Sequence, residues 1–184
     1  SIDTFRSEVA RQAVNAGACM VNDISAGKLD TQMLETIGDL QIPYCMMHMR
    51  GTPQTMKTLT DYKNITKEVL FYFSERVAAA RTCNINDIIV DPGFGFAKTT
   101  DQNFELLKHL ELFETLNLPV LAGVSRKSMV YKTLDISAKE ALNGTTALHM
   151  VALQKGARIL RVHDVQPATE CIKLFKQLNT TKCN

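Results

Sequence analysis

The chain has 184 residues, of which 45% are hydrophobic and 22% are charged, and its formal net charge is +2. This composition is ordinary for a globular protein and predicts one domain over residues 1–184. No basic run suggests a nucleic-acid partner, and no apolar stretch approaches the roughly 20 residues that a membrane helix needs.

Short apolar strands alternate with amphipathic helices along the whole chain. Strands are expected at 19–24, 44–49, 88–91, 120–123 and 159–162, and residues 1–3 resemble the end of another strand. Helices are expected after Asp3 to about residue 16, at 29–37, at 61–81, and from about residues 101, 127, 137 and 167.

Three helix features can be specified further. Asp101 is expected to cap the helix that follows it, and Ser137 with Glu140 has the spacing of a capping box. The last helix is expected to bury the side that carries Cys171, Leu174, Phe175 and Leu178.

Strict alternation of strand and helix predicts a parallel sheet with right-handed crossovers and helices outside it. Candidate functional residues follow five or six different strand ends, which favours a (β/α)8 TIM-barrel over an open doubly wound sheet with one switch point. A closed barrel needs eight strands and typically about 250 residues. We therefore expect an incomplete barrel of about five full β/α units, truncated on its N-terminal side.

Asp91 is the leading candidate for the site, because it ends a buried apolar strand and opens the segment DPGFGF. A carboxylate at such a rim is costly unless it is paired or receives hydrogen bonds from a ligand, although a helix cap or a salt bridge would also explain it. Asp3 and Asn22 end two preceding strands. Each alone suits a structural role, but the three together suit the N–H-rich edge of an amino-pyrimidinone ring.

Two later motifs carry cations. SRKS places Lys127 and Ser128 at the start of a helix, where anions are favoured, although a solvated basic turn is an equal alternative. In RVHD, Arg161 and His163 are two residues apart on an extended strand and face the same side. Both can donate to a phosphate-type leaving group, whereas a lone histidine there is more often structural.

The segment MHMRGTP is predicted to leave a strand as a loop. Met47 could pack on a flat ring, and Phe96 could stack on an aromatic ligand or close the rim. His48 has no neighbouring His or Cys in the sequence and is interpreted as structural. The chain has no P-loop, dinucleotide glycine fingerprint or zinc spacing. Its five cysteines form no C-x-x-C pair, which favours reduced thiols and a cytoplasmic location.

Six motifs in order resemble the dihydropteroate synthase family over essentially the whole chain. They are SIDT, VNDISAG, MHMRGTPQTM, DPGFGFAKTTDQNFELL, GVSRKSM and RVHDV. The resemblance implies a transferase of folate biosynthesis that condenses 4-aminobenzoate with 6-hydroxymethyl-7,8-dihydropterin diphosphate and releases diphosphate. It also implies that sulfonamides, which mimic aminobenzoate in this family, act on the complete enzyme.

The matching motifs imply three groups of contacts, with Asp91, Lys127 and Arg161 as the catalytic residues. The pterin would contact Asp3, Asn22, Met47, Asp91, Phe96 and Lys127; the diphosphate Asn22, Arg161 and His163; and the aminobenzoate Phe96, Lys127 and Ser128.

The resemblance further implies Mg²⁺ as a cofactor, with its ligand in an N-terminal part that this chain lacks, so no metal ligand is assigned here. A homodimer through the late helices, roughly residues 137–156 and 167–178, is the oligomer that the family suggests. Two other functions stay open: a methyltetrahydrofolate-binding methyltransferase-type domain, and an inactive pterin-binding fragment.

Overall fold

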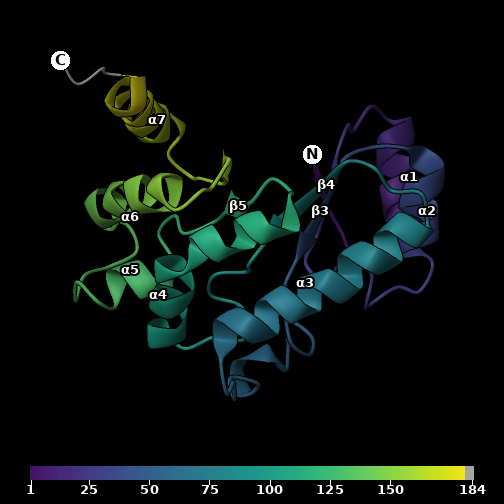
Figure 1. The fold of residues 1–184 in the computed structure, drawn as a ribbon, viewed down its shortest axis with the longest axis horizontal. Helices are drawn as coiled ribbons and strands as arrows, with labels where there is room; N and C mark the ends of the chain where they lie inside the picture. Colours follow the sequence, from purple (N-terminus) through teal and green to yellow (C-terminus); the bar gives the residue numbers. More distant parts are fainter. Residues whose placement is uncertain (181–184) are drawn as a thin grey trace.

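The computed structural model describes residues 1–180 (Figure 1). Six short strands in it pair in parallel. The strands are β1 (Ile2–Asp3), β2 (Val21–Asp23), β3 (Tyr44–Met47), β4 (Ile88–Asp91), β5 (Leu121–Ala122) and β6 (Ile159–Leu160). The helices are α1 (Ser7–Asn15), α2 (Met33–Leu40), α3 (Ile65–Thr82), α4 (Thr100–Lys108), α5 (Ser128–Tyr131), α6 (Leu142–Gln154) and α7 (Val165–Thr180), with 3₁₀ turns η1 (Met56–Thr58) and η2 (Leu110–Leu116).

Neighbouring strands in the sequence are also neighbours in space. β1 to β4 form one parallel sheet in that order, β5 pairs with β6, and a parallel bridge between Val90 and Val120 joins the two groups. The helices follow one another around the outside of the strands (Figure 1). An order without reversal is that of a barrel wall and not of a doubly wound sheet, so residues 1–180 form an open arc of a barrel.

The strands alternate their side chains between two environments, as the period of two requires. Tyr44, Met46, Ile88 and Val90 are buried in the core beneath the helices. Phe73 of α3 packs edge-on against Phe113 in the same core. The alternate positions of the same strands face the inside of the arc, and they include the candidate site residues.

The helix predicted at 29–37 is shifted to α2 at 33–40, α3 begins at residue 65 and not 61, and two predicted helix caps differ from the structure. The residue that caps α4 is Thr99 and not Asp101, because the Thr99 hydroxyl accepts from the Gln102 N–H while the Gln102 side chain accepts from the Thr99 N–H. Glu140 accepts hydrogen bonds from the Ser137 N–H and hydroxyl, but the Glu140 N–H goes to the Ser137 carbonyl and α6 begins only at Leu142, so these residues form a turn before the helix and not its capping box.

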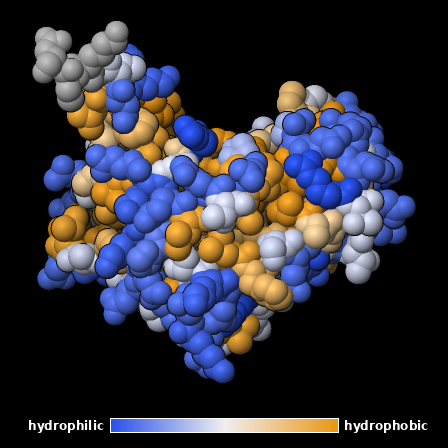
Figure 2. All heavy atoms as spheres, viewed as in Figure 1, coloured by the Kyte–Doolittle hydropathy of each residue, from blue (hydrophilic) through white to orange (hydrophobic). Residues whose placement is uncertain are grey.

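The predicted buried side of α7 is wrong for most of its length. Cys171 is buried, but Leu174 is 66% exposed and Leu178 is 62% exposed. α7 packs on α6, and its C-terminal end extends away from the strands (Figure 1). Figure 2 shows the resulting hydrophobic surface on α7.

Candidate active site

The candidate site lies at the carboxyl ends of the strands. A cavity of about 310 Å³ there is lined by Met47 of β3, Asp91 of β4, Phe96, Lys127, and both Arg161 and His163 after β6. Met47 and Asp91 are paired neighbours in the β3–β4 register. Six residues from sequence-distant motifs therefore share one cavity, as the barrel geometry predicts.

Asp91 is buried and its carboxylate is held in place. Its Oδ1 accepts a 2.8 Å hydrogen bond from the Gly93 N–H. Burial raises the pKa of Asp91, while Lys127, the Gly93 N–H, Lys98 and Arg161 oppose that rise. A carboxylate surrounded by three cations retains affinity for further N–H donors without being neutralised by a single partner.

The turn that follows Asp91 requires glycine at residue 93. Gly93 has a φ of 71°, which is the left-handed region, and a Cβ there would lie 2.1 Å from the carbonyl oxygen of His48. This close approach packs the DPGFGF turn against the end of β3. It thereby fixes where Asp91 and Phe96 enter the cavity.

Lys127 lies between the aromatic and acidic sides of the cavity. Its ammonium donates to the Phe94 carbonyl and lies 5.0 Å from the centroid of the Phe96 ring. Burial lowers the pKa of Lys127, and Asp91 partly restores it. Ser128 begins α5 beside Lys127 but does not line the cavity. The other cation of SRKS, Arg126, points elsewhere and forms a two-pronged ion pair with Asp164.

Arg161 and His163 form the more exposed side of the cavity. Arg161 makes an ion pair with Asp3, and Asp3 Oδ1 accepts a 2.8 Å hydrogen bond from Asn22 Nδ2. Asp3 and Asn22 therefore join the site through Arg161 and do not line the cavity themselves. His163 Nδ1 lies 2.9 Å from Ser125 Oγ, which orients the imidazole.

Two residues of this region escaped the sequence analysis. Cys45 is fully buried, and it faces the same side as Met47 because the two are two residues apart on β3. Burial raises the pKa of the Cys45 thiol, and the Asp91 charge raises it further, so the thiol stays protonated. The period-two spacing from Met47 was the available signal.

The second is Lys98, a buried lysine behind the cavity. Its ammonium lies 2.9 Å from the Gly93 carbonyl, 3.0 Å from the Phe96 carbonyl and 2.9 Å from His48 Nδ1. Burial lowers the pKa of Lys98 to about 7. Lys98 thus ties the middle and the end of the DPGFGF segment to His48, which follows β3. No sequence signal marks it, because two of its partners are backbone carbonyls.

The described residues do not by themselves fit a metal centre. Among residues 1–180 no group of three or more His, Cys, Asp or Glu side chains is placed to hold a metal ion. One buried oxygen of the site, Asn22 Oδ1, lacks a hydrogen-bond partner in this part of the chain. Mg²⁺ takes few protein oxygens and completes its shell with waters and substrate phosphates, so Asn22 Oδ1 is the one oxygen here that could contribute to such a shell.

Comparison with known proteins assigns the chain to a family. Residues 1–163 match the family described as pterin binding enzyme. The chain belongs to the pterin-binding enzyme family. It is 46% identical over 181 residues to the dihydropteroate synthase of Synechocystis sp. (strain ATCC 27184 / PCC 6803 / Kazusa), covering 97% of this chain and 63% of that protein. The chain thus spans less than two thirds of the length of this curated relative.

Solved structures of pterin-binding enzymes agree with the fold. Dihydropteroate synthase from Stenotrophomonas maltophilia, with imidazole bound in its active site, superimposes with a TM-score of 0.95 at 36% identity, covering 99% of this chain and 69% of that one. The Xanthomonas albilineans enzyme in complex with 7,8-dihydropteroate gives a TM-score of 0.89 at 36% identity, covering 98% and 66%. The predicted fold class, an incomplete (β/α)8 barrel, is confirmed.

Proposed function

We propose that this chain provides the catalytic strand ends of a dihydropteroate synthase. The enzyme joins 4-aminobenzoate to 6-hydroxymethyl-7,8-dihydropterin diphosphate and releases diphosphate. The observation that carries the proposal is the convergence of Asp91, Lys127 and Arg161 on one cavity. Similarity to dihydropteroate synthases, including one solved with 7,8-dihydropteroate, supports the same reaction.

The charges of the cavity suit the bond that breaks. The C–O bond between the pterin methylene and the diphosphate breaks with its electron pair leaving on the diphosphate, so positive charge develops on the methylene and the ring. The Asp91 carboxylate, buried beside this position, stabilises that charge, and Arg161 with His163 stabilises the departing anion. Fixed charges of this kind need no reorganisation during the reaction.

The second half of the reaction depends on position. The amine nitrogen of aminobenzoate bonds to the methylene carbon and then loses a proton to solvent. Phe96 and Lys127, which are already stacked, offer a flat surface and a cation for an aromatic carboxylate, and Ser128 at the start of α5 is the adjacent hydroxyl. Holding the amine beside the carbon supplies much of the remaining rate enhancement.

Pterin recognition is assigned to the inner face of the arc. Asp91, Met47 and Phe96 contact the ring within the cavity, and Lys127 donates to it. Asp3 and Asn22 complete the pterin and diphosphate contacts from the neighbouring strands, joined by their 2.8 Å hydrogen bond. A Mg²⁺ cofactor is proposed from the resemblance to dihydropteroate synthases.

The test compares binding and turnover in matched variants. Calorimetry should detect a dihydropterin ligand binding to the chain, weakened in Asp91→Asn and unchanged in Asp101→Asn, an exposed carboxylate on α4. Release of diphosphate that depends on 4-aminobenzoate should likewise fall in Asp91→Asn and stay unchanged in Asp101→Asn. Binding of methyltetrahydrofolate without any diphosphate release would favour the methyltransferase-type alternative. Pterin binding without turnover would leave a binding fragment.

We also propose a homodimer through α6 and α7. A groove between these helices contains Met150, Cys171 and the exposed Leu174, an apolar surface that suits a second copy. Sedimentation of Leu174→Ser beside the unmodified chain tests this contact.

A cytoplasmic location is proposed as well, supported by the four unpaired cysteines in residues 1–180, as expected in a reducing compartment.

Among residues 1–180, no helix is both long enough and apolar enough to cross a membrane.

A further inference from the structure

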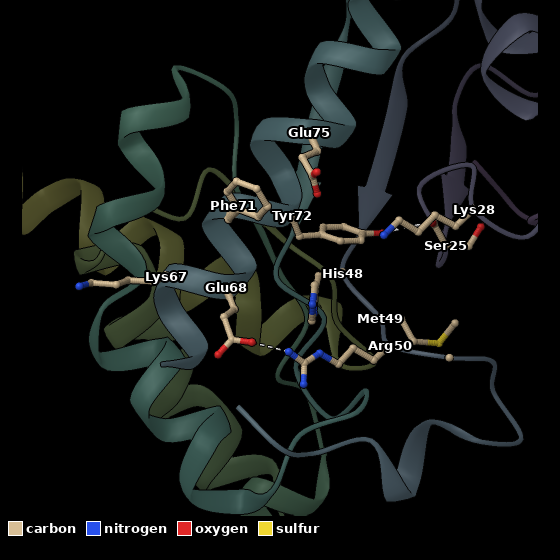
Figure 3. Close-up of a pocket in the computed structure, with 11 residues that line it drawn as sticks. Ser25, Lys28, His48, Met49, Arg50, Lys67, Glu68, Phe71, Tyr72 and Glu75 are labelled. Carbon is tan, nitrogen blue, oxygen red and sulfur yellow. Dashed lines mark hydrogen bonds and ion pairs between the residues drawn. The ribbon is translucent and has the colours of Figure 1, made fainter. Parts of the chain in front are cut away.

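A second cavity, of about 530 Å³, lies on the other side of the β3 end. It is formed by the loops after β2 and β3 and by the first half of α3, and none of its lining residues lines the Asp91 cavity (Figure 3). Met49 and the aromatic rings of Phe71 and Tyr72 form its apolar part. Phe71 is 65% exposed although it is a large aromatic residue. This volume is in the range of small-molecule sites.

His48 presents a hydrogen-bond donor to this cavity. Its imidazole lies between the Tyr72 ring, edge-on at 4.8 Å, and the Arg50 guanidinium (Figure 3). Below about pH 7, where Lys98 is an ammonium whose other two protons go to carbonyls, Nδ1 of His48 is the acceptor and Nε2 carries the proton. Within residues 1–180 no group accepts from Nε2. Burial, followed by the charges of Lys98, Arg50 and Lys28, lowers the pKa of His48 to about 2, so the ring stays neutral.

The cations around this imidazole are incompletely neutralised. Glu68 is already satisfied by Arg50 and by the backbone N–H groups of Lys63 and Asn64. Lys28 lies 4.5 Å from the centroid of the Tyr72 ring and forms no ion pair with any residue between 1 and 180. Burial and the charge of Arg76 lower the pKa of Lys28, and only Glu75 opposes them. An anion entering here would therefore relieve repulsion between cations.

We propose that this cavity binds a small aromatic anion. The oxyanion group, a carboxylate or a phosphate, lies between the Lys28 ammonium and the His48 Nε2–H, and the ring packs on Met49 and Phe71. The Lys28 ammonium and a neutral N–H donor hold the charge, as in charge-assisted hydrogen bonds. The chain thus has a ligand site separate from the proposed pterin cavity: β3 supplies Met47 to the pterin cavity, and the segment that follows β3 supplies His48 and Met49 to this one.

Two methionines give each cavity its own reporter, because Met47 lines the Asp91 cavity and Met49 lines this one. In a chain labelled at the methionine methyls with ¹³C, phenyl phosphate is titrated and both methyl resonances are followed. Met47→Leu and Met49→Leu assign the two signals. We expect a saturable shift of the Met49 methyl, whereas phenol, which lacks the charge, should not shift it.

Matched variants decide where the probe binds. Lys28→Gln should weaken the Met49 response about tenfold, and Lys28→Arg should restore it. Arg161→Gln, which alters the other cavity, should leave the Met49 response unchanged. The proposal is overturned if the Met49 methyl does not shift at millimolar phenyl phosphate, if Lys28→Gln has no effect, or if Arg161→Gln abolishes the shift. Inorganic phosphate that binds as tightly as phenyl phosphate would overturn the aromatic part.

Discussion

Two cavities meet at the end of β3, and they differ in how their charges are balanced. On the Met47 side, Asp91 faces Lys127 and Arg161, so each sign has a partner. On the His48 side, Lys28 has no ion-pair partner within residues 1–180, and Glu68 is already occupied. Met47 and His48 are consecutive, yet Met47 lines a cavity with paired charges and His48 lines a cavity with an unpaired cation. The first cavity suits a reaction that separates charge, whereas the unpaired Lys28 of the second is the basis of the anion site proposed there.

The largest effect is expected from disturbing the contact between the DPGFGF turn and the end of β3. Gly93→Ala places a Cβ 2.1 Å from the His48 carbonyl at a φ of 71°. The free energy of unfolding should fall by about 3 kcal/mol or more, measured by urea denaturation. Gly17→Ala is the matched control, since its φ is also positive but nothing lies within 4 Å of its added Cβ. Equal losses in both variants would show that backbone strain alone is responsible.

Asp91→Asn should separate the two cavities. Loss of a buried charge-assisted hydrogen bond should weaken dihydropterin binding by about 2 kcal/mol, or about 30-fold, in calorimetry. The Met49 methyl response to phenyl phosphate should not change, because Asp91 does not line that cavity. A change at both cavities would mean that the two sites are coupled and do not bind their ligands independently.

Lys98 connects the cavities and should make stability depend on pH. Its pKa in the folded chain is about 7, below the ordinary value of 10.5. Between these values the unfolded chain binds the additional proton, so the free energy of unfolding should rise with pH, by up to about 1.4 kcal/mol per unit. Urea denaturation at about pH 7.5 and 9 measures this slope. It should decrease in Lys98→Met and persist in Lys173→Met, an exposed lysine on α7.

The smallest effect is expected at the cap of α4, just after the DPGFGF turn. Thr99→Ala removes the hydroxyl that accepts from Gln102 and should cost about 1 kcal/mol of unfolding free energy. Thermal denaturation checks this, and Asp101→Ala should cost less because Asp101 is not the cap. A larger loss in Asp101→Ala than in Thr99→Ala would show that Asp101 is the cap, as the sequence predicts. Ligand binding in both cavities should be unaffected.

The sequence predicted the strands better than the contacts beyond them. Residues 88–91 were predicted as a strand and form β4, because an apolar run that ends in Asp-Pro-Gly leaves little choice. The cap of α4 was misplaced because Thr99 and Asp101 are both good capping residues, and only the backbone path selects between them. The buried side of α7 was wrong because periodicity shows an apolar face but not what covers it.

The same limit applies to the site. Met47, Asp91, Phe96, Lys127, Arg161 and His163 lie around one cavity at the strand ends, whereas Asp3, Asn22 and Ser128, which the motifs also mark, do not line it. His48 was interpreted as structural for want of a neighbouring His or Cys, and its actual partner is a lysine 50 residues away. Arg126 and Lys127 are adjacent, yet one pairs with Asp164 and the other reaches the cavity. Such choices depend on rotamers and distant partners, which a single sequence does not reveal.

The buried thiol of Cys45 can report local opening of the strand ends. Its thiol is fully buried and its pKa is raised, so an alkylating reagent can modify it only when β3 transiently separates from its neighbours. The alkylation rate of this one residue, read by mass spectrometry, therefore reports how often the barrel wall opens. A pterin bound against Met47 should slow that rate, which turns an unreactive thiol into a measure of site occupancy.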